Sequence, residues 1–294
     1  MQLVVLAAGH GRRFGGLKQL APVGPNGEAI MDYTAYAAQS CGYAGVVVVV
    51  REEIADEIRA HVRKNWPAGL DVEFVCQPPL PGTAQAVVSA KGLIDGPFGV
   101  ANADDLYGEA AFADLIGHFP PGAEYDPARA PHLLVSYRLV QTVLTNGPLS
   151  RGLIAVSPSG CLDAIVEHTV RLRDDGRFDA TPFASNDADA RRTTPESPQV
   201  LSGDEPVSMN LWGFHPRILA ELEAALERFD PEHAPRPELL LADVVGQLVD
   251  HRRDEVQVRA TTARSIGLTN PEDLDIVRDE LALQPISARA ARTR

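Results

Sequence analysis

A short stretch near the start of the chain brings glycines and long cationic side chains together. In "LAAGHGRRFGGLKQL" an apolar run ends at Gly9 and Gly11, and Arg12, Arg13 and Lys18 follow. The backbone N–H groups of a glycine loop bind phosphate oxygens, as do guanidinium and ammonium groups. The stretch therefore predicts a loop that holds a phosphorylated ligand. The competing interpretation is a glycine turn whose arginines are only solvated.

Two common phosphate-binding patterns do not fit this loop. A dinucleotide fingerprint needs a third glycine, and Phe14 stands in its place. A Walker loop needs Lys followed by Ser or Thr, but Leu17 occupies the lysine position and Gln19 follows Lys18. A Rossmann oxidoreductase and a P-loop enzyme are therefore disfavoured.

A third pattern, G-x-G-[TS]-R followed by a short gap and Lys, fits except that Arg12 replaces Thr or Ser. With this pattern the stretch resembles the signature of the sugar-1-phosphate nucleotidyltransferases, also called NDP-sugar pyrophosphorylases. The resemblance implies that Arg13 and Lys18 are catalytic. It also implies nucleotide binding by Ala8, Gly9, Gly11 and Arg12.

Two later stretches extend the resemblance in the family's order. "QPPLPGTAQAV" is similar to the base-reading loop and implies that Gln77, Gly82 and Thr83 bind the nucleotide. "VANADDLYG" is similar to the strand that ends in a metal-binding aspartate, so Asp104 is implied as a catalytic residue and a Mg²⁺ ligand, with Asp105 beside it. The alternatives are a polar residue that ends a strand and a pair of helix-capping aspartates.

The second half resembles the family more loosely. Gly152, Glu167 and Asn210 match positions that contact the sugar phosphate. The lysine that usually follows the glutamate is His168, so the cation for the sugar phosphate is in question, with His168 or Arg171 as substitutes.

The C-terminal region "IGLTNPEDLDIV" also departs from the family pattern. Gly267 falls where the second metal ligand usually sits, and Asn270 is a nearby substitute. The identity of any second metal ligand therefore stays open.

The elements that would position these residues alternate between strand and helix over residues 1–118. Alternation of this kind predicts an α/β fold with a Rossmann-like, doubly wound mixed sheet of the nucleotidyltransferase type. Residues 119–283 contain several strand-like stretches and form the expected C-terminal, sugar-phosphate-binding half, with 171–206 as a flexible polar loop. We expect one domain over 1–283 and a disordered basic tail over 284–294.

The implied reaction joins a nucleoside triphosphate to a sugar 1-phosphate and releases pyrophosphate. A cytidylyltransferase for phosphocholine or another small phosphate is an alternative, since the second half decides the acceptor. A catalytically weak, nucleotide-binding regulatory protein of the same fold is another. The base and the sugar are not determined by the sequence.

Composition limits the partners of the protein. The net charge is -13, which disfavours nucleic acid as a partner. No apolar run reaches the ~18 residues of a membrane span. The absence of a secretory pattern indicates a cytoplasmic protein. A homo-oligomer is possible, because the helices expected over 216–229 and 237–249 could form an interface as well as a core.

Overall fold

The structure is a computed structural model, and the ranges that it describes hold most of the chain. They are residues 1–9, 14, 16–80, 82–120, 126, 128–144, 147–183, 199–268 and 273–282.

The N-terminal half contains four parallel strands of one sheet, in the order β3–β2–β1–β4. They are β1 (Gln2–Leu6), β2 (Gly45–Val50), β3 (Val72–Cys76) and β4 (Phe98–Asn102). The five valines of β2 are buried, which suits a strand covered on both faces. The predicted doubly wound α/β arrangement is confirmed.

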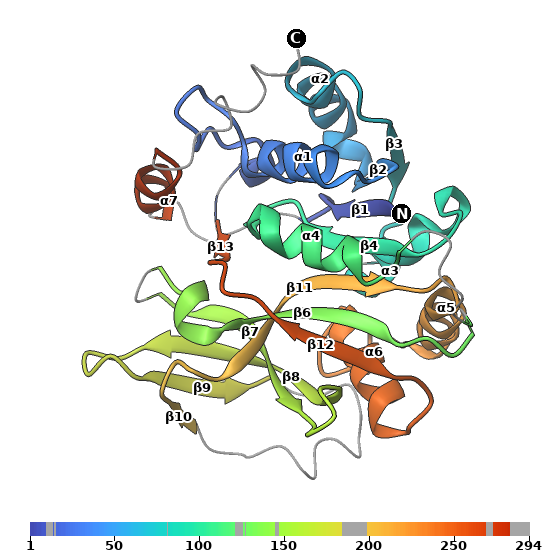
Figure 1. Ribbon diagram of the computed structural model, residues 1–294, viewed down its shortest axis with the longest axis vertical. Helices are drawn as coiled ribbons and strands as arrows, with labels where there is room; N and C mark the ends of the chain where they lie inside the picture. The colour runs from blue at the N-terminus through green and yellow to red at the C-terminus, as the bar shows by residue number, and fades with distance from the viewer. Residues whose placement is uncertain are drawn as a thin grey trace.

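Helices connect these strands (Figure 1). They are α1 (Ile30–Cys41), α2 (Ala55–Asn65), α3 (Thr83–Ser89) and α4 (Glu109–Gly117), with short 3-10 turns η1 (Lys18–Leu20), η2 (Glu52–Ile54), η3 (Lys91–Leu93) and, later, η4 (Leu139–Thr142). Helix α1 ends at Gly42, which adopts a left-handed conformation with φ 81°. Glycine is favoured at such a helix end because it has no Cβ to clash.

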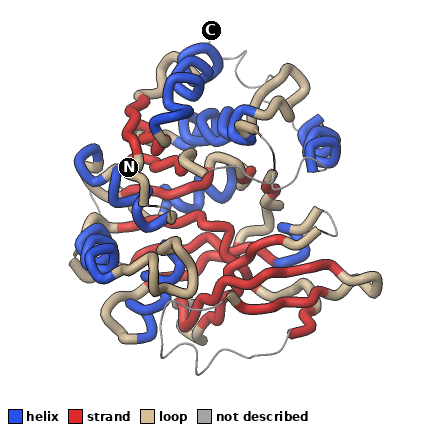
Figure 2. The backbone as a smooth tube through the Cα atoms, turned by 180° about the vertical axis from the view of Figure 1, so that it is seen from behind, coloured by secondary structure: helices blue, strands red, loops and turns tan. Residues whose placement is uncertain are grey.

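The C-terminal half continues the same sheet with mostly antiparallel strands. They are β6 (His132–Arg138), β7 (Leu149–Val156), β8 (Leu162–Leu172), β9 (Phe178–Pro182), β10 (Gln199–Leu201), β11 (Pro206–Phe214) and β12 (Val256–Ala260). β11 pairs with β4 and so joins the two halves, and Figure 2 shows the strands as one continuous sheet through the molecule. A separate two-stranded ladder is formed by β5 (Asp105–Leu106) and β13 (Ile266–Gly267).

Two hydrophobic cores lie on the two faces of the sheet. One contains α1, α2 and α4 with residues such as Leu3, Val48 and Phe112. The other contains α3, α5 (Ile218–Arg228) and α6 (Leu241–Asp250) with residues such as Val4 and Trp212. A smaller cluster packs α7 (Asp273–Ala282) against β5 and β13.

The expectation of a loop over 171–206 is wrong for the part that the structure describes. β8 extends to Leu172, and β9 and β10 add two more antiparallel strands. Apolar residues that alternate with polar ones, such as Phe178, Ala180 and Leu201, are buried in the core, and this burial stabilises strands in a polar segment. Residues 184–198, which belong to the same prediction, lie outside the described residues, as does the tail 284–294.

Candidate active site

Lys18 and Asp104 meet at the C-terminal edge of the parallel strands. β1 and β4 are neighbours, with Leu6 opposite Asn102, so the segments that follow them leave the sheet at the same edge. Lys18 Nζ forms an ion pair with Asp104 Oδ2, and the two side chains are 19% and 21% exposed. A cation and a carboxylate that remain open to solvent at a strand edge can both bind a phosphorylated ligand or its metal.

Gln19 fixes the start of the glycine loop. Its side chain is buried, and its Nε2 donates hydrogen bonds to the carbonyl oxygens of Ala7 and Gly9, at 3.1 and 2.9 Å. These bonds hold the chain on both sides of Ala8. The motif does not predict this role of Gln19, although a polar residue next to Lys18 is a signal that points to it.

Asp105 stands beside Asp104 and opposite Gly267. Asp105 on β5 pairs with Gly267 on β13, and a Cβ added to Gly267 would overlap Asp105 Oδ1. The Asp105 carboxylate thus fills the space that a side chain at position 267 would need. Burial, with the charge of Asp104, raises the pKa of Asp105 to about 6.

A chain of side-chain hydrogen bonds connects this edge to the C-terminal half. Asn102 Nδ2 donates to Asp105, and Asn210 Nδ2 donates to Asn102 Oδ1, both at 2.8 Å. Trp212 Nε1 in turn donates to Asn210 Oδ1 at 2.8 Å. Asn210 lies in an irregular part of β11 with φ 62°, a left-handed conformation in which Asn is among the best tolerated non-glycine residues.

The loop after β3 is held by its own side chain. Gln77 Nε2 donates to the carbonyl oxygens of Leu80 and Gly82, at 3.0 and 3.2 Å. Gly82 has φ 123° and lies against the backbone of Leu239, where a Cβ would overlap the Leu239 carbonyl oxygen. Thr83 Oγ1 accepts a hydrogen bond from the N–H of Leu241 at 2.8 Å. These contacts join the base-reading loop of the sequence analysis to the start of α6.

The residues expected to contact the sugar phosphate lie together on β7, β8 and β11. Gly152 pairs with Glu167 on one side and with Ser208 on the other. A Cβ at Gly152 would lie 3.2 Å from Glu167 Oε1. Glycine at this position therefore leaves room for the Glu167 carboxylate. Ser208, the partner of Gly152 on β11, comes two residues before Asn210.

Charged groups surround Glu167. Burial and the charge of Asp243 raise the pKa of Glu167 to about 7, although Arg236 and Arg151 act in the opposite direction. Arg236 Nη2 donates to Asp243. The guanidinium of Arg236 lies over the ring of Phe183, 5.4 Å from its centroid. These partners could not be predicted from the sequence, since they belong to segments far apart in the chain.

Neither expected substitute for the missing lysine provides a cation here. His168 is buried, its Nδ1–H donates to the carbonyl oxygen of Val166 at 2.7 Å, and burial lowers its pKa. Arg171 is exposed on β8 opposite Asp179, four residues beyond Glu167.

Four residues of the sequence analysis lie outside the described residues. They are Gly11, Arg12, Arg13 and Asn270.

The carboxylates of Asp104 and Asp105 fit a magnesium ion. Mg²⁺ keeps several of its waters and binds proteins through one or two carboxylates together with substrate phosphates. Within the described ranges, no group of three or more His, Cys, Asp or Glu side chains could hold a metal without such help. The residues present thus suit an ion that arrives with a nucleotide.

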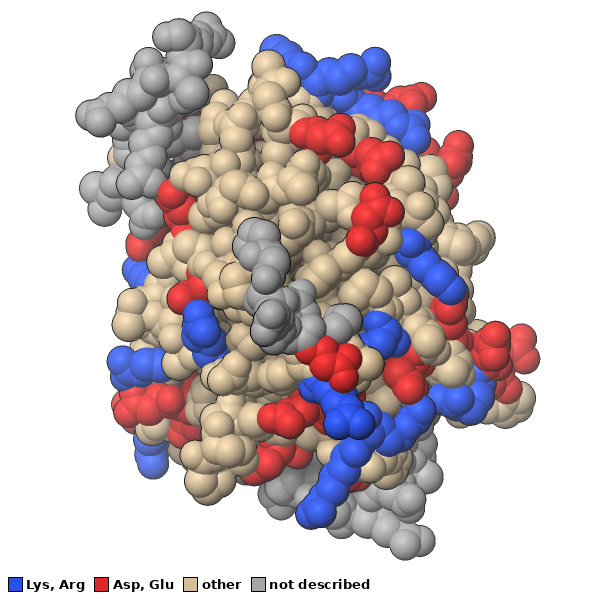
Figure 3. Space-filling model, turned by 45° about the vertical axis from the view of Figure 1, so that its right-hand side comes forward, with Lys and Arg blue, Asp and Glu red and all other residues tan. Residues whose placement is uncertain are grey.

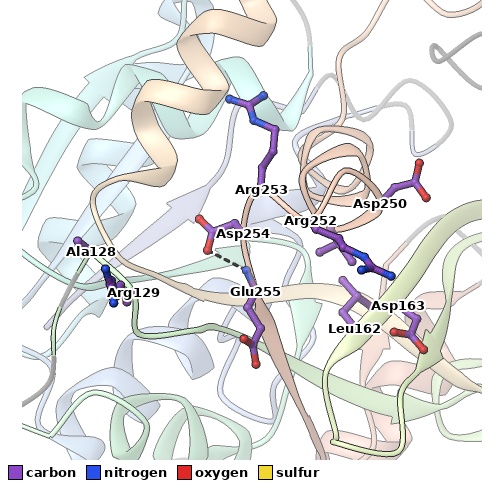
Figure 4. A pocket seen from close by; sticks show the side chains of 10 residues that line it. Ala128, Arg129, Leu162, Asp163, Asp250, Arg252, Arg253, Asp254 and Glu255 are labelled. Carbon is purple, nitrogen blue, oxygen red and sulfur yellow. Dashed lines mark hydrogen bonds between the residues drawn. The ribbon is translucent and has the colours of Figure 1, made fainter.

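A cavity of about 630 Å³ lies apart from these residues, around the start of β8 and the end of α6. Figure 4 shows its lining, which includes Arg253, Asp254 and Glu255. Asp254 is already bound by His132 and Arg217, and Arg253 by Glu221. These charges are therefore used in holding the fold.

Figure 3 shows Lys and Arg side chains intermingled with Asp and Glu on the face in view. Among the helices of the described chain, none has the length and apolar character that crossing a bilayer requires.

Comparison with known families identifies the class of the protein. Residues 3–145 match the family model described as "MobA-like NTP transferase domain". This segment contains the glycine loop, Lys18, Gln77 and Asp104. This part of the chain is an NTP transferase domain, and the protein is a nucleotidyltransferase.

Solved structures show that nearly the whole chain has the fold of known nucleotidyltransferases. An inositol-1-phosphate CTP transferase from T. maritima is 14% identical with a TM-score of 0.62, and the alignment covers 97% of each chain. A putative glucose-1-phosphate thymidylyltransferase from Bacillus anthracis, in complex with a sucrose, is 11% identical with a TM-score of 0.64, over 96% of this chain and 95% of that one. No curated protein sequence matches the chain.

Proposed function

We propose that the protein joins a nucleoside triphosphate to a sugar 1-phosphate, giving an NDP-sugar and pyrophosphate. The observation that carries this proposal is the Lys18–Asp104 ion pair at the edge of an NTP transferase sheet. The hydrogen-bonded chain from Asp105 to Asn210 supports it further, because it runs from this edge towards Gly152 and Glu167. The likeness to two sugar-phosphate nucleotidyltransferases over nearly the whole chain agrees with it.

The proposed reaction needs positioning more than acid–base chemistry. A phosphate oxygen of the sugar 1-phosphate is already a nucleophile at neutral pH, and it attacks the α-phosphorus in line. The two anions must approach to about 3–3.5 Å, against their mutual repulsion. Lys18 would neutralise charge on the α-phosphate, and Arg13 with the amides of Gly9 and Gly11 would hold the departing pyrophosphate.

Asp104 would hold a Mg²⁺ ion, with Asp105 beside it. When bound, the ion neutralises phosphate oxygens and fixes their orientation. Lys18 would then exchange its ion pair with Asp104 for contact with the nucleotide, so that the two side chains separate as the substrates bind.

In this proposal, residues of the N-terminal half bind the nucleotide and residues of the C-terminal half bind the sugar phosphate. Gln77, Gly82 and Thr83 would contact the nucleotide, next to Ala8 and Arg12 on the first loop. Gly152, Glu167 and Asn210 would contact the sugar phosphate. We also propose a cytoplasmic location, where nucleoside triphosphates are available and where the three thiols of the chain stay reduced.

The test is pyrophosphate release. The protein is incubated with Mg²⁺, each NTP or dTTP, and a panel of sugar 1-phosphates, with Asp104→Ala as the control. Release that requires one sugar phosphate and disappears in the control is the expected result. Nucleotide binding without release from any pair would contradict the proposal and favour a regulatory role.

A further inference from the structure

Arg236 contacts Asp243 of α6 and Phe183, which follows β9. It belongs to the segment that joins α5 to α6. The end of this segment is fixed to the N-terminal half, because Leu239 packs on Gly82 and Leu241 donates to Thr83. The guanidinium itself lies over Phe183, whose backbone N–H donates to the carbonyl oxygen of Glu167 at 2.7 Å.

Two donors of Arg236 have no acceptor among the described residues. The side chain is 15% exposed, and Nη2 is used by Asp243. Nε and Nη1 are buried without a hydrogen-bond partner. Buried donors of a charged group are costly when left unpaired, so two of them in a binding region indicate oxygens supplied by a ligand.

The groups around Arg236 suit hydroxyls better than a second phosphate. Glu167 lies near Arg236, because the ring that the guanidinium covers belongs to Phe183, which is hydrogen-bonded to the Glu167 backbone; Asp243 is directly paired with Arg236. The ion pair with Asp243 already offsets the charge of the arginine, so a dianion gains little there. A hydroxyl both donates and accepts, so it can accept a hydrogen bond from a guanidinium and donate one to a nearby carboxyl group.

The same arrangement disfavours a cationic acceptor such as phosphocholine. A quaternary ammonium binds over the face of an aromatic ring. One face of Phe183 is covered by a guanidinium, which would repel a second cation.

We infer that Arg236, together with Glu167, binds vicinal hydroxyls of the acceptor and selects a neutral polyhydroxylated phosphate, a sugar or a cyclitol phosphate, over the phosphate of a cationic alcohol. This inference rests on the proposed function, because it names the substrate class of the same site.

The experiment compares wild type with Arg236→Met, Arg236→Lys and the control Arg228→Met. Arg228 is an exposed arginine at the end of α5. Pyrophosphate release is measured with sugar 1-phosphates, inositol phosphates and phosphocholine. Binding of the preferred acceptor is measured by calorimetry with a non-hydrolysable NTP analogue present. Circular dichroism confirms that each variant is folded.

In Arg236→Met we expect the KM and the Kd for the polyol phosphate to rise about 10- to 100-fold, while the KM for the NTP stays within about threefold of wild type. The Arg228→Met control should match wild type. With a deoxy analogue that lacks the recognised hydroxyl, wild type and Arg236→Met should have the same KM.

Three results would overturn the inference, and they separate it from the proposed function. If wild type uses a sugar phosphate and Arg236→Met has an unchanged KM and Kd, the inference is wrong and the function stands. Preference of wild type for phosphocholine would overturn both the inference and the sugar specificity. Absence of turnover by wild type with every acceptor would remove the function and the inference with it.

Discussion

At the scale of single residues, the ion pair of Lys18 and Asp104 is the contact on which the proposed reaction depends. Each side chain neutralises the other at a sheet edge where each remains partly exposed. An ion pair of this kind is weak in water-accessible surroundings, so phosphate and Mg²⁺ can compete for its partners. In the proposed reaction, the pair keeps both groups near the place of the reacting phosphates before the substrates arrive.

Removal of the Lys18 ammonium should slow the chemical step. In Lys18→Met we expect kcat to fall by about 10²–10³, with a smaller change in the KM for the NTP, because the charge is needed most in the transition state. Steady-state pyrophosphate release measures both constants. Lys91→Met is the matched control, since Lys91 is an exposed lysine paired with Glu223 on the surface. An equal loss in both variants would show that Lys18 has no special role.

Glu167 should make the stability of the protein depend on pH. Its pKa is raised to about 7 in the folded state, above its ordinary value of about 4.3, because burial disfavours the charged carboxylate. Its contribution to the free energy of unfolding is therefore full below pH 4.3, and it is lost as the pH rises through about 7. Glu167→Gln, which does not ionise, should gain stability relative to wild type between pH 5 and pH 8, by on the order of 2 kcal/mol. Urea unfolding at the two pH values measures this difference, and a difference independent of pH would contradict the raised pKa.

At the scale of elements, the irregular part of β11 positions Asn210. Asn210→Ala removes the acceptor of the buried Trp212 Nε1–H and the donor to Asn102, so the free energy of unfolding should fall by about 1–3 kcal/mol. Asn210→Gly loses the same bonds but relaxes the backbone at φ 62°, so it should be more stable than Asn210→Ala by up to about 1 kcal/mol. Thermal and urea unfolding compare the two variants. The reverse order would mean that the conformation at Asn210 carries no strain.

The close approach of Gly82 and Leu239 couples the loop after β3 to the loop before α6. Gly82→Ala places a Cβ against the Leu239 carbonyl oxygen and meets an unfavourable φ of 123°, so both loops must move. We expect kcat/KM for the NTP to fall by about 10- to 100-fold. Gly92→Ala is the control, because Gly92 has nothing within 4 Å of the added Cβ. Similar activity in the two variants would show that this contact does not position the nucleotide.

The sequence predicted the parallel half well because its elements have strong local patterns. The valines of β2 and the glycine after α1 define a buried strand and a helix end without reference to the rest of the fold. β9 and β10 were missed because their short apolar alternation lies among charged residues, and only pairing with β8 makes them strands. A motif made Lys18 and Asp104 candidates, and the structure brings them together, whereas Arg236 and Phe183 have no local signal. Their contact depends on the folding of distant segments onto one another.

At the scale of the whole molecule, the parallel strands of the N-terminal half and the mostly antiparallel strands of the C-terminal half form one continuous sheet. β11 comes late in the chain but pairs with β4 of the N-terminal half through Trp212, Gly213 and Phe214. Trp212 and Phe214 are fully buried and stack at 5.6 Å in the core that also contains α3, α5 and α6. If the C-terminal half unfolds, the N-terminal strands therefore lose most of the hydrophobic packing on one face of the sheet.

The shared sheet predicts that the two halves unfold in one transition. The chain has two tryptophans, and each half contains one: Trp66 at the end of α2 and Trp212 in β11. In Trp212→Phe, fluorescence reports on the N-terminal half, and in Trp66→Phe it reports on the C-terminal half. Within each variant, the urea midpoint from fluorescence should equal the midpoint from far-ultraviolet circular dichroism, because a two-state transition gives coincident curves for different probes. The comparison is made inside each variant because each substitution also removes an indole hydrogen bond, to Asp32 or to Asn210. A fluorescence midpoint that differs from the circular dichroism midpoint in either variant would mean that the halves are separate folding units, and that β11 adds to the N-terminal sheet without being required for it.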